Sequence, residues 1–142
     1  MVRNFQRANQ AIKYSEKPVV AAPFGLCLGG GCEIALHACH LQAGAETYMG
    51  LVELGVGLIP AGGGTKEMLL RSLAKAAGDP EEDLFPHLRQ GFETIAMGKV
   101  SGSALEARKL GFLREHDGIS MSCDRVIQEA KDWVLSLAHQ GY

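Results

Sequence analysis

The fold of this chain is decided by residues 22–65, which read APFGLCLGGGCEIALHACHLQAGAETYMGLVELGVGLIPAGGGT. This segment contains two glycine-rich turns, 28–33 and 59–65, and two glutamates, Glu33 and Glu53, each in apolar surroundings. A glycine triplet lets the backbone turn tightly and leaves its amide N–H groups uncovered by side chains. We therefore expect such a turn to present uncovered backbone N–H groups.

The first turn lies between a predicted strand and a predicted helix. Residues 19–22 are apolar and bounded by two prolines, which indicates a short buried strand. Residues 32–39 are predicted to form a mostly buried helix. The amides of Gly30 and Gly31 would then lie at its N-terminus, where unpaired N–H groups and the helix dipole favour negative charge. Such a place can stabilise an oxyanion.

Elsewhere the apolar periodicity and the turn residues predict alternating short strands and helices, which is an α/β fold. Thr65 is predicted to be the N-cap of the helix after the second glycine turn, and Ser103 with Glu106 resembles a capping box. Gly111 is predicted to end the helix that Ser103 begins. The predicted elements are helices over 4–14, 66–73, about 83–96, 103–110 and 124–138, extended segments over 40–45 and 47–52, and turns at 78–82 and 117–118.

Composition excludes several classes of protein. The chain has 142 residues, 46% of them hydrophobic, and a net charge of −2, so it has no broad basic surface for nucleic acid. It has neither a long apolar run for a membrane span nor a signal-peptide pattern at its start. Four cysteines without a C-x-x-C pair indicate reduced core thiols, although a disulfide stays open. We expect a soluble, cytoplasmic protein.

Each motif also has a simpler interpretation. Either glycine run alone is compatible with a tight turn that binds nothing, and neither has the spacing of a nucleotide-binding loop. His37, Cys39 and His40 suggest metal ligands, but no further ligand pair follows at zinc spacing, so core or surface histidines are favoured. Cys32 has no evident base that would make it a nucleophile. Glu53, flanked by Val52 and Leu54, is paired, exposed, or has its pKa raised by burial.

Taken together, the motifs resemble the enoyl-CoA hydratase/isomerase (crotonase) superfamily. Residues 17–22 and 28–33 resemble its first signature, and residues 49–53 and 57–65 resemble its second, in the same order and at compatible spacing. Residues 101–113 resemble a later segment, and residues 92–101 resemble a subgroup. In that subgroup a hydratase region follows a 3-hydroxyacyl-CoA dehydrogenase region within one long fatty-acid oxidation protein.

The resemblance implies particular site residues. Gly30 matches the position whose N–H is one half of the oxyanion hole for the thioester carbonyl. Glu33 and Glu53 match the two catalytic glutamates that hold one water between them; the former activates the water and the latter handles the proton at the α-carbon. Substrate-binding positions are implied at Leu28, Gly29, Gly31, Pro60 and Gly62, and Lys17 and Lys66 are candidates for the phosphates of coenzyme A.

The resemblance also implies what this segment lacks. It matches the C-terminal part of the crotonase spiral, and the family's other oxyanion amide lies upstream of the first signature. We therefore expect one partial domain over 1–142, with a core over 15–73, a helical insertion over 74–98 and C-terminal helices over 99–142. This fragment is expected to turn over weakly or not at all. It is expected to need no cofactor, with NAD serving the dehydrogenase region, and to form homo-oligomers.

Three functions are compatible with these motifs. Hydration of 2-enoyl-CoA to 3-hydroxyacyl-CoA in fatty-acid β-oxidation is favoured, because both carboxylates are present. An enoyl-CoA isomerase needs only one carboxylate to move a proton. A non-catalytic scaffold or oligomerisation module would keep the glycine turns for their role in folding alone.

Overall fold

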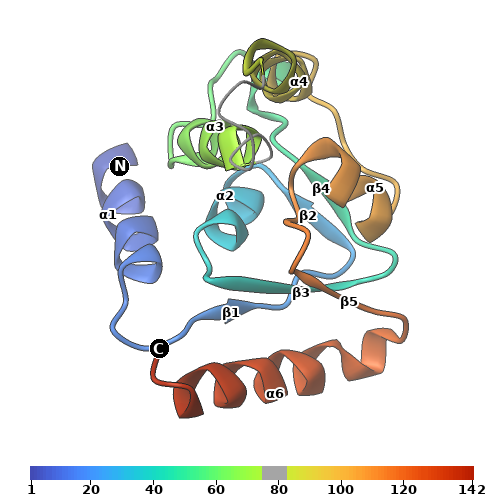
Figure 1. Cartoon of the computed structure of the whole chain (residues 1–142). Helices are drawn as coiled ribbons and strands as arrows, with labels where there is room; N and C mark the ends of the chain where they lie inside the picture. The colour runs from blue at the N-terminus through green and yellow to red at the C-terminus, as the bar shows by residue number, and fades with distance from the viewer. Residues whose placement is uncertain (75–82) are drawn as a thin grey trace.

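The computed structural model describes residues 1–74 and 83–142 and shows an α/β arrangement of short strands and surrounding helices (Figure 1). Three strands, β1 (Val20–Ala21), β3 (His40–Gly44) and β5 (Gly118–Ser120), form one parallel sheet in the order β1-β3-β5. Two more, β2 (Leu26–Leu28) and β4 (Tyr48–Gly50), form a second parallel pair. Parallel pairs need crossover connections, and α2 (Gly30–Leu36) lies in the connection between β2 and β4.

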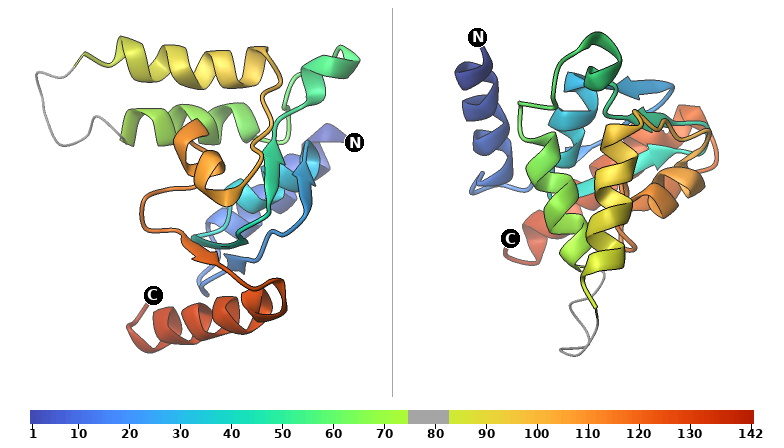
Figure 2. Two further views of the ribbon diagram at one scale, coloured as in Figure 1. Left: turned by 90° about the vertical axis from the view of Figure 1, so that its right-hand side faces the viewer. Right: turned by 90° about the horizontal axis from the view of Figure 1, so that it is seen from above.

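Helices cover the sheets from several sides. The C-terminal helix α6 (Val126–His139), preceded by the short 3₁₀ helix η2 (Cys123–Arg125), runs along β1 and β3 on the face opposite α2 (Figure 1). Helices α3 (Gly64–Ala74) and α4 (Phe85–Ala96) lie side by side in both views of Figure 2. The remaining helices are α1 (Val2–Lys13), the 3₁₀ helix η1 (Glu53–Val56) and α5 (Ala104–Leu110).

The core forms where these elements meet. Leu36 of α2, Leu41 of β3 and Met68 of α3 are buried around Phe112, which is fully buried. Asp117 attaches the C-terminal segment to this core, because its carboxylate accepts hydrogen bonds from the Leu41 N–H (2.9 Å) and from the Arg114 guanidinium (3.0 Å). The pairing of β3 with β5 therefore has a buried polar anchor beside it.

Most predicted elements are present, but several boundaries differ. The helix expected over 32–39 spans Gly30–Leu36, so His37 ends it and His40 lies in β3. The prediction that Thr65 is an N-cap is wrong, because α3 already begins at Gly64 and the Thr65 hydroxyl donates to the Pro60 carbonyl (3.2 Å). The predicted turn at 78–82 lies outside the described residues.

Strands β2 and β5 were not predicted. Each has three residues, too few for an apolar alternation to be recognised, and each depends on a distant partner: β2 on β4, and β5 on β3. Gly118, which was expected in a turn, begins β5. Its place in the strand leaves room for the Gln42 side chain, because a Cβ atom on Gly118 would overlap that side chain.

The capping of α5 gives a test of local stability. The Ser103 hydroxyl accepts a hydrogen bond from the Glu106 N–H (3.2 Å), as the capping-box motif predicts, although the Glu106 carboxylate accepts from Gly102 rather than from Ser103. Ser103→Ala should lower the free energy of unfolding by about 1 kcal/mol in urea denaturation, because this N-cap bond is lost. Ser122→Ala is the control, since Ser122 precedes η2 without a side-chain cap bond. Equal effects of the two substitutions would contradict this assignment.

Candidate active site

Glu33 is a buried carboxylate held by the second glycine turn. It lies in the first turn of α2 and is 3% exposed. Its Oε1 accepts a hydrogen bond from the Gly64 N–H (2.9 Å), and a Cβ atom on Gly62 would lie only 2.6 Å from its Oε2. The glycines at 62 and 64 are therefore required for the backbone to approach this carboxylate so closely.

Glu53 lies in van der Waals contact with the first glycine turn. It begins η1, and a Cβ atom on Gly29 would lie 3.5 Å from its Oε1. Both of its carboxylate oxygens are shielded from solvent, and neither has a hydrogen-bond partner within the part of the chain that the structure describes. A shielded carboxylate without a partner is costly, so this arrangement needs an explanation.

The electrostatics of Glu53 link it to Glu33. Burial raises the pKa of the Glu53 carboxyl, and the negative charge of Glu33 raises it further. The two carboxylates, twenty residues apart in the sequence, are thus close enough to act on each other. Glu53 is the carboxylate with the raised pKa, and Glu33 is the one with a fixed hydrogen-bond donor, the Gly64 N–H.

Gly29 to Gly31 form the turn that leads from β2 into α2. Gly29 has a φ of 54° and a ψ of −129°, and its N–H donates to the Gly50 carbonyl (2.8 Å) as β2 ends. The N–H groups of Gly30 and Gly31 are the first two of α2, where no intrahelical acceptor exists. A Cβ atom on Gly31 would meet no atom within 4 Å, so that position is open.

Helix α1 forms one wall of the site, which the sequence motifs did not indicate. Gln6 and Asn9 donate side-chain hydrogen bonds to the carbonyls of Ala61 (2.7 Å) and Gly62 (2.9 Å). These bonds hold the Phe5 ring 3.5 Å from the position of a Cβ atom on Gly30. The only sequence signal for this wall is that Phe5 lies on the apolar face of an amphipathic helix.

The other predicted positions lie around the same turns. Leu28 pairs with Gly50 in the β2–β4 ladder. Pro60 is buried near the start of the second glycine-rich turn. Lys66, a candidate for a phosphate contact, forms an ion pair with Glu67 (2.9 Å). Nothing in the structure tests a role for Lys17.

The metal and thiol alternatives have no structural support. The residues that the structure describes contain no group of three or more His, Cys, Asp or Glu side chains that could hold a metal ion. Cys27, Cys32, Cys39 and Cys123 are all free thiols, and Cys32 is fully buried. A hydrogen bond with Cys27, together with burial, raises the pKa of Cys32 well above its ordinary value. A protonated thiol is a poor nucleophile.

In the described part of the chain, no helix is sufficiently long and apolar to cross a bilayer.

The packing at Gly62 gives a second test. Gly62→Ala should destabilise the fold by about 1–3 kcal/mol, because the new methyl group would press on the Phe5 ring and on Oε2 of Glu33. In a Phe5→Ala background the loss should shrink, and the difference measures the coupling in a double-mutant cycle. Gly31→Ala is the matched control, since it faces open space. A loss no larger than that of the control would refute the contact.

The titration of Glu53 gives a third test. Carbon-13 NMR of the carboxyl group should show a pKa above 4.5, and Glu33→Gln should lower it by removing a nearby negative charge. Because the folded-state pKa is raised, the contribution of this group to stability is present below about pH 4.5 and is lost as the pH rises through the folded pKa. Glu46→Gln, at an exposed position, should leave the titration unchanged. An unaltered Glu53 pKa in Glu33→Gln would show that the two groups are not coupled.

Comparisons with known proteins find relatives along the whole chain. Residues 1–79 match the family model described as Enoyl-CoA hydratase/isomerase. A protein of Bacillus subtilis (strain 168) named "Probable 3-hydroxyacyl-CoA dehydrogenase" is 49% identical over 142 residues, which are 100% of this chain and 17% of that protein. "Fatty acid oxidation complex subunit alpha" of Idiomarina loihiensis is 33% identical over 133 residues, 92% of this chain and 16% of that protein.

A solved structure shows the same fold. The crystal structure of enoyl-CoA hydratase from Bacillus anthracis superposes with a TM-score of 0.72 at 24% identity, over 96% of this chain and 46% of that one. The crotonase-like fold expected from the motifs is thus confirmed, and the chain spans less than half the length of the proteins it matches. Because the family model covers more than half of its residues, this chain belongs to the enoyl-CoA hydratase/isomerase family.

Proposed function

We propose that this chain carries the hydration site of a 2-enoyl-CoA hydratase and works as part of a longer fatty-acid oxidation protein. The observation that carries the proposal is the pair of carboxylates: Glu53, shielded and without a partner, lies within electrostatic reach of Glu33, whose own carboxylate is fixed by Gly64. A water between the two would supply the hydrogen bonds that Glu53 lacks.

The two carboxylates are suited to different roles. One oxygen of Glu33 accepts a hydrogen bond from the Gly64 N–H, which leaves the other to accept a proton from a water while the oxygen of that water bonds to the β-carbon. Glu53, whose pKa is raised by burial and by Glu33, gives a proton to the α-carbon. Addition of water therefore needs one ionised and one protonated carboxyl group, and unequal surroundings provide that difference.

The Gly30 N–H supplies the electrostatic part of the mechanism. As water adds to the double bond, negative charge builds up on the thioester oxygen, and a fixed amide donor offsets it. The family resemblance assigns a second donor to a segment upstream of the first signature. With one donor alone, about 3 kcal/mol of transition-state stabilisation would be missing, so we expect the 142-residue chain by itself to be slow.

The relatives suggest the setting of this site. The matching proteins carry dehydrogenase or fatty-acid oxidation names and are about six times longer than this chain. We propose that hydration itself needs no cofactor here, that NAD serves a separate dehydrogenase region, and that the assembled protein is a homo-oligomer. The four free thiols fit a reducing, cytoplasmic compartment.

Glutamine substitutions test the proposal. In the longest reading frame that contains this sequence, Glu33→Gln and Glu53→Gln should each lower kcat for hydration of crotonyl-CoA by about 10²–10⁴-fold, because each removes a proton-transfer group. The reaction is followed by the loss of the conjugated thioester absorbance. Glu46→Gln is the control, since its exposed side chain is not part of the site.

The pattern of losses separates the alternatives. Hydration that survives both substitutions would end the carboxylate hypothesis. If the protein isomerises a 3-enoyl-CoA, and this reaction is lost in Glu53→Gln but kept in Glu33→Gln, the protein is an isomerase instead. Absence of both reactions in the unsubstituted full-length protein would favour a scaffold.

A further inference from the structure

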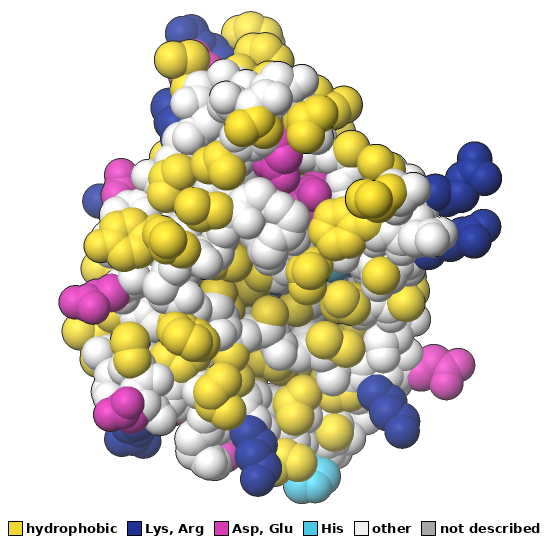
Figure 3. Space-filling view, turned by 180° about the vertical axis from the view of Figure 1, so that it is seen from behind, with side chains coloured by type: hydrophobic (Ala, Val, Ile, Leu, Met, Phe, Trp, Pro, Cys, Tyr) yellow, Lys and Arg dark blue, Asp and Glu magenta, His cyan; other side chains and the backbone are white. Residues whose placement is uncertain are grey.

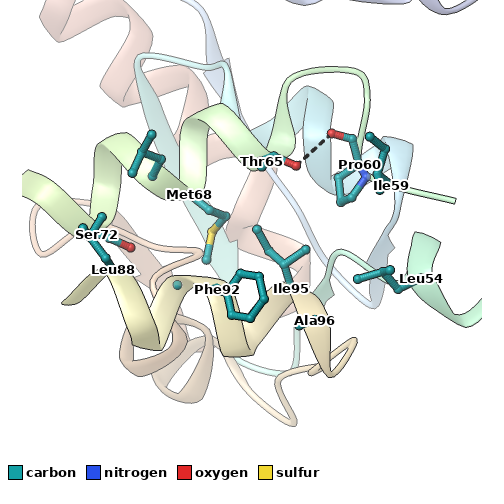
Figure 4. A pocket seen from close by; sticks show the side chains of 12 residues that line it. Leu54, Ile59, Pro60, Thr65, Met68, Ser72, Leu88, Phe92, Ile95 and Ala96 are labelled. Carbon is teal, nitrogen blue, oxygen red and sulfur yellow. Dashed lines mark hydrogen bonds between the residues drawn. The ribbon is translucent and has the colours of Figure 1, made fainter. Parts of the chain in front are cut away.

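The second glycine-rich turn has to hold its shape without the help of a strand. Residues 57–63 connect η1 with α3 and lie outside both sheets. One bond closes the turn from within, because the Thr65 hydroxyl donates to the Pro60 carbonyl (3.2 Å; Figure 4). The turn also has to bring the Gly64 N–H to Oε1 of Glu33. Its shape therefore depends on side chains from neighbouring elements.

Helix α1 supplies hydrogen-bond donors to this turn. The Asn9 side chain donates from Nδ2 to the Gly62 carbonyl (2.9 Å). Three residues earlier on the same face of α1, the Gln6 side chain donates from Nε2 to the Ala61 carbonyl (2.7 Å). The Phe5 ring fills the space that a Cβ atom on Gly62 would occupy. Two consecutive carbonyls of the turn are therefore held by α1.

Helix α2 contacts the next residue of the turn. The His37 ring donates from Nδ1 to the Glu33 carbonyl (2.7 Å), so the ring is fixed on the helix that carries Glu33. A Cβ atom on Gly63 would lie only 2.7 Å from Nε2 of His37. The backbone of the turn is thus in contact with both α1 and α2, and the Gly64 N–H reaches Glu33 from this fixed position.

Of the two donors on α1, Asn9 is the one that water cannot replace. Gln6 is exposed, so a water molecule can take over its hydrogen bond to Ala61. Asn9 is fully buried, and its loss would leave the carbonyl of Gly62, a residue that is also buried, without a donor. The Oδ1 atom of Asn9 is buried too and has no hydrogen-bond partner within residues 1–74 and 83–142. A buried amide with an unpaired oxygen costs stability, and such a cost is kept mostly where a site needs it.

Acidic side chains in apolar surroundings depend on fixed donors. On the face seen in Figure 3, a small group of acidic side chains is recessed among apolar ones. A carboxylate in such a place stays ionised only where protein donors replace water. We propose that Asn9 is a positioning residue for hydration: it holds the Gly62 carbonyl and, through the turn, keeps the Gly64 N–H directed at Glu33. The inference rests on the proposed function, because that function makes the ionised Glu33 carboxylate the group that takes a proton from water.

Amide hydrogen exchange tests this role without any catalysis. In the 142-residue chain, Asn9→Leu should speed exchange of the Gly64 amide by about tenfold or more, because the turn that holds this amide loses its buried donor. The Leu41 amide, which donates to Asp117 (2.9 Å), is the internal reference for a general loss of stability and should change less. Asn4→Leu is the matched control and should leave both rates unchanged, since Asn4 lies on the same helix but is exposed.

The pattern of exchange rates decides the result. A selective increase at Gly64 is the expected outcome. Equal acceleration at Gly64 and Leu41, or equal effects of Asn9→Leu and Asn4→Leu, would overturn the role of Asn9. If leucine overfills the site and unfolds the chain, Asn9→Ala removes the same donor with a smaller side chain. It should give the same selective increase, and acceleration of both amides in that variant would overturn the role as well.

A kinetic arm connects the turn to the reaction. In the longest reading frame that contains this sequence, Asn9→Leu should lower kcat for hydration of crotonyl-CoA by about tenfold or more and change KM by less than about twofold, because it misplaces a proton-transfer group. In a Glu33→Gln background the same substitution should add little, since the group that Asn9 positions is already gone. A substitution that merely weakens the fold would lower the activity by a similar factor in both backgrounds, and that result would refute the positioning role.

The two proposals can fail separately. Exchange of the Gly64 amide needs neither substrate nor turnover, so it does not depend on hydration. A selective increase at Gly64, in a full-length protein that hydrates no enoyl-CoA, would refute the proposed function and leave Asn9 as the residue that fixes this turn. Hydration with a kcat that Asn9→Leu does not change would refute the positioning role alone.

Discussion

The site depends on one hydrogen bond, from the Gly64 N–H to Oε1 of Glu33. It joins the start of α3 to the first turn of α2 and so brings together the two glycine turns, which lie about thirty residues apart in the sequence. Without it, Glu33 would be a 3%-exposed carboxylate with no donor, which is one of the more expensive states for a side chain. Because this bond occupies Oε1 of Glu33, Oε2 is the oxygen of that carboxylate that it leaves free.

The second constraint is the pairing of β2 with β4. The register places Leu28 opposite Gly50, and the Gly29 N–H continues the ladder to the Gly50 carbonyl. Strands β2 and β4 therefore end side by side: β2 is followed by the first glycine turn, and β4 is followed by the segment that carries Glu53. Two short strands determine the approach of Glu53 to Gly29, and the packing of α1 through Gln6 and Asn9 closes the opposite wall.

Much of this was predictable from the sequence because the glycines and prolines mark the turns directly. The glycine turns and the capping of α5 by Ser103 follow from local chemistry, whereas Glu33 and Glu53 were singled out as a pair by the resemblance to the family. Strands β2 and β5 and the α1 wall did not follow, because each exists only through contacts with distant residues. The error at Thr65 has a different, local cause: α3 begins one residue earlier, at Gly64, and the Thr65 hydroxyl donates to the Pro60 carbonyl five residues back.

The unequal treatment of the two glutamates is itself informative. A fold selected for stability alone would replace Glu53 with an apolar residue, since its oxygens are shielded, have no hydrogen-bond partner among residues 1–74 and 83–142, and are repelled by the charge of Glu33. Local rules are broken in this way mostly where a site needs it. Glu67, by contrast, is a buried carboxylate that is paired with Lys13 and Lys66. The chain can therefore neutralise a buried acid, and among the described residues no cation or hydrogen-bond donor does the same for the side-chain oxygens of Glu53.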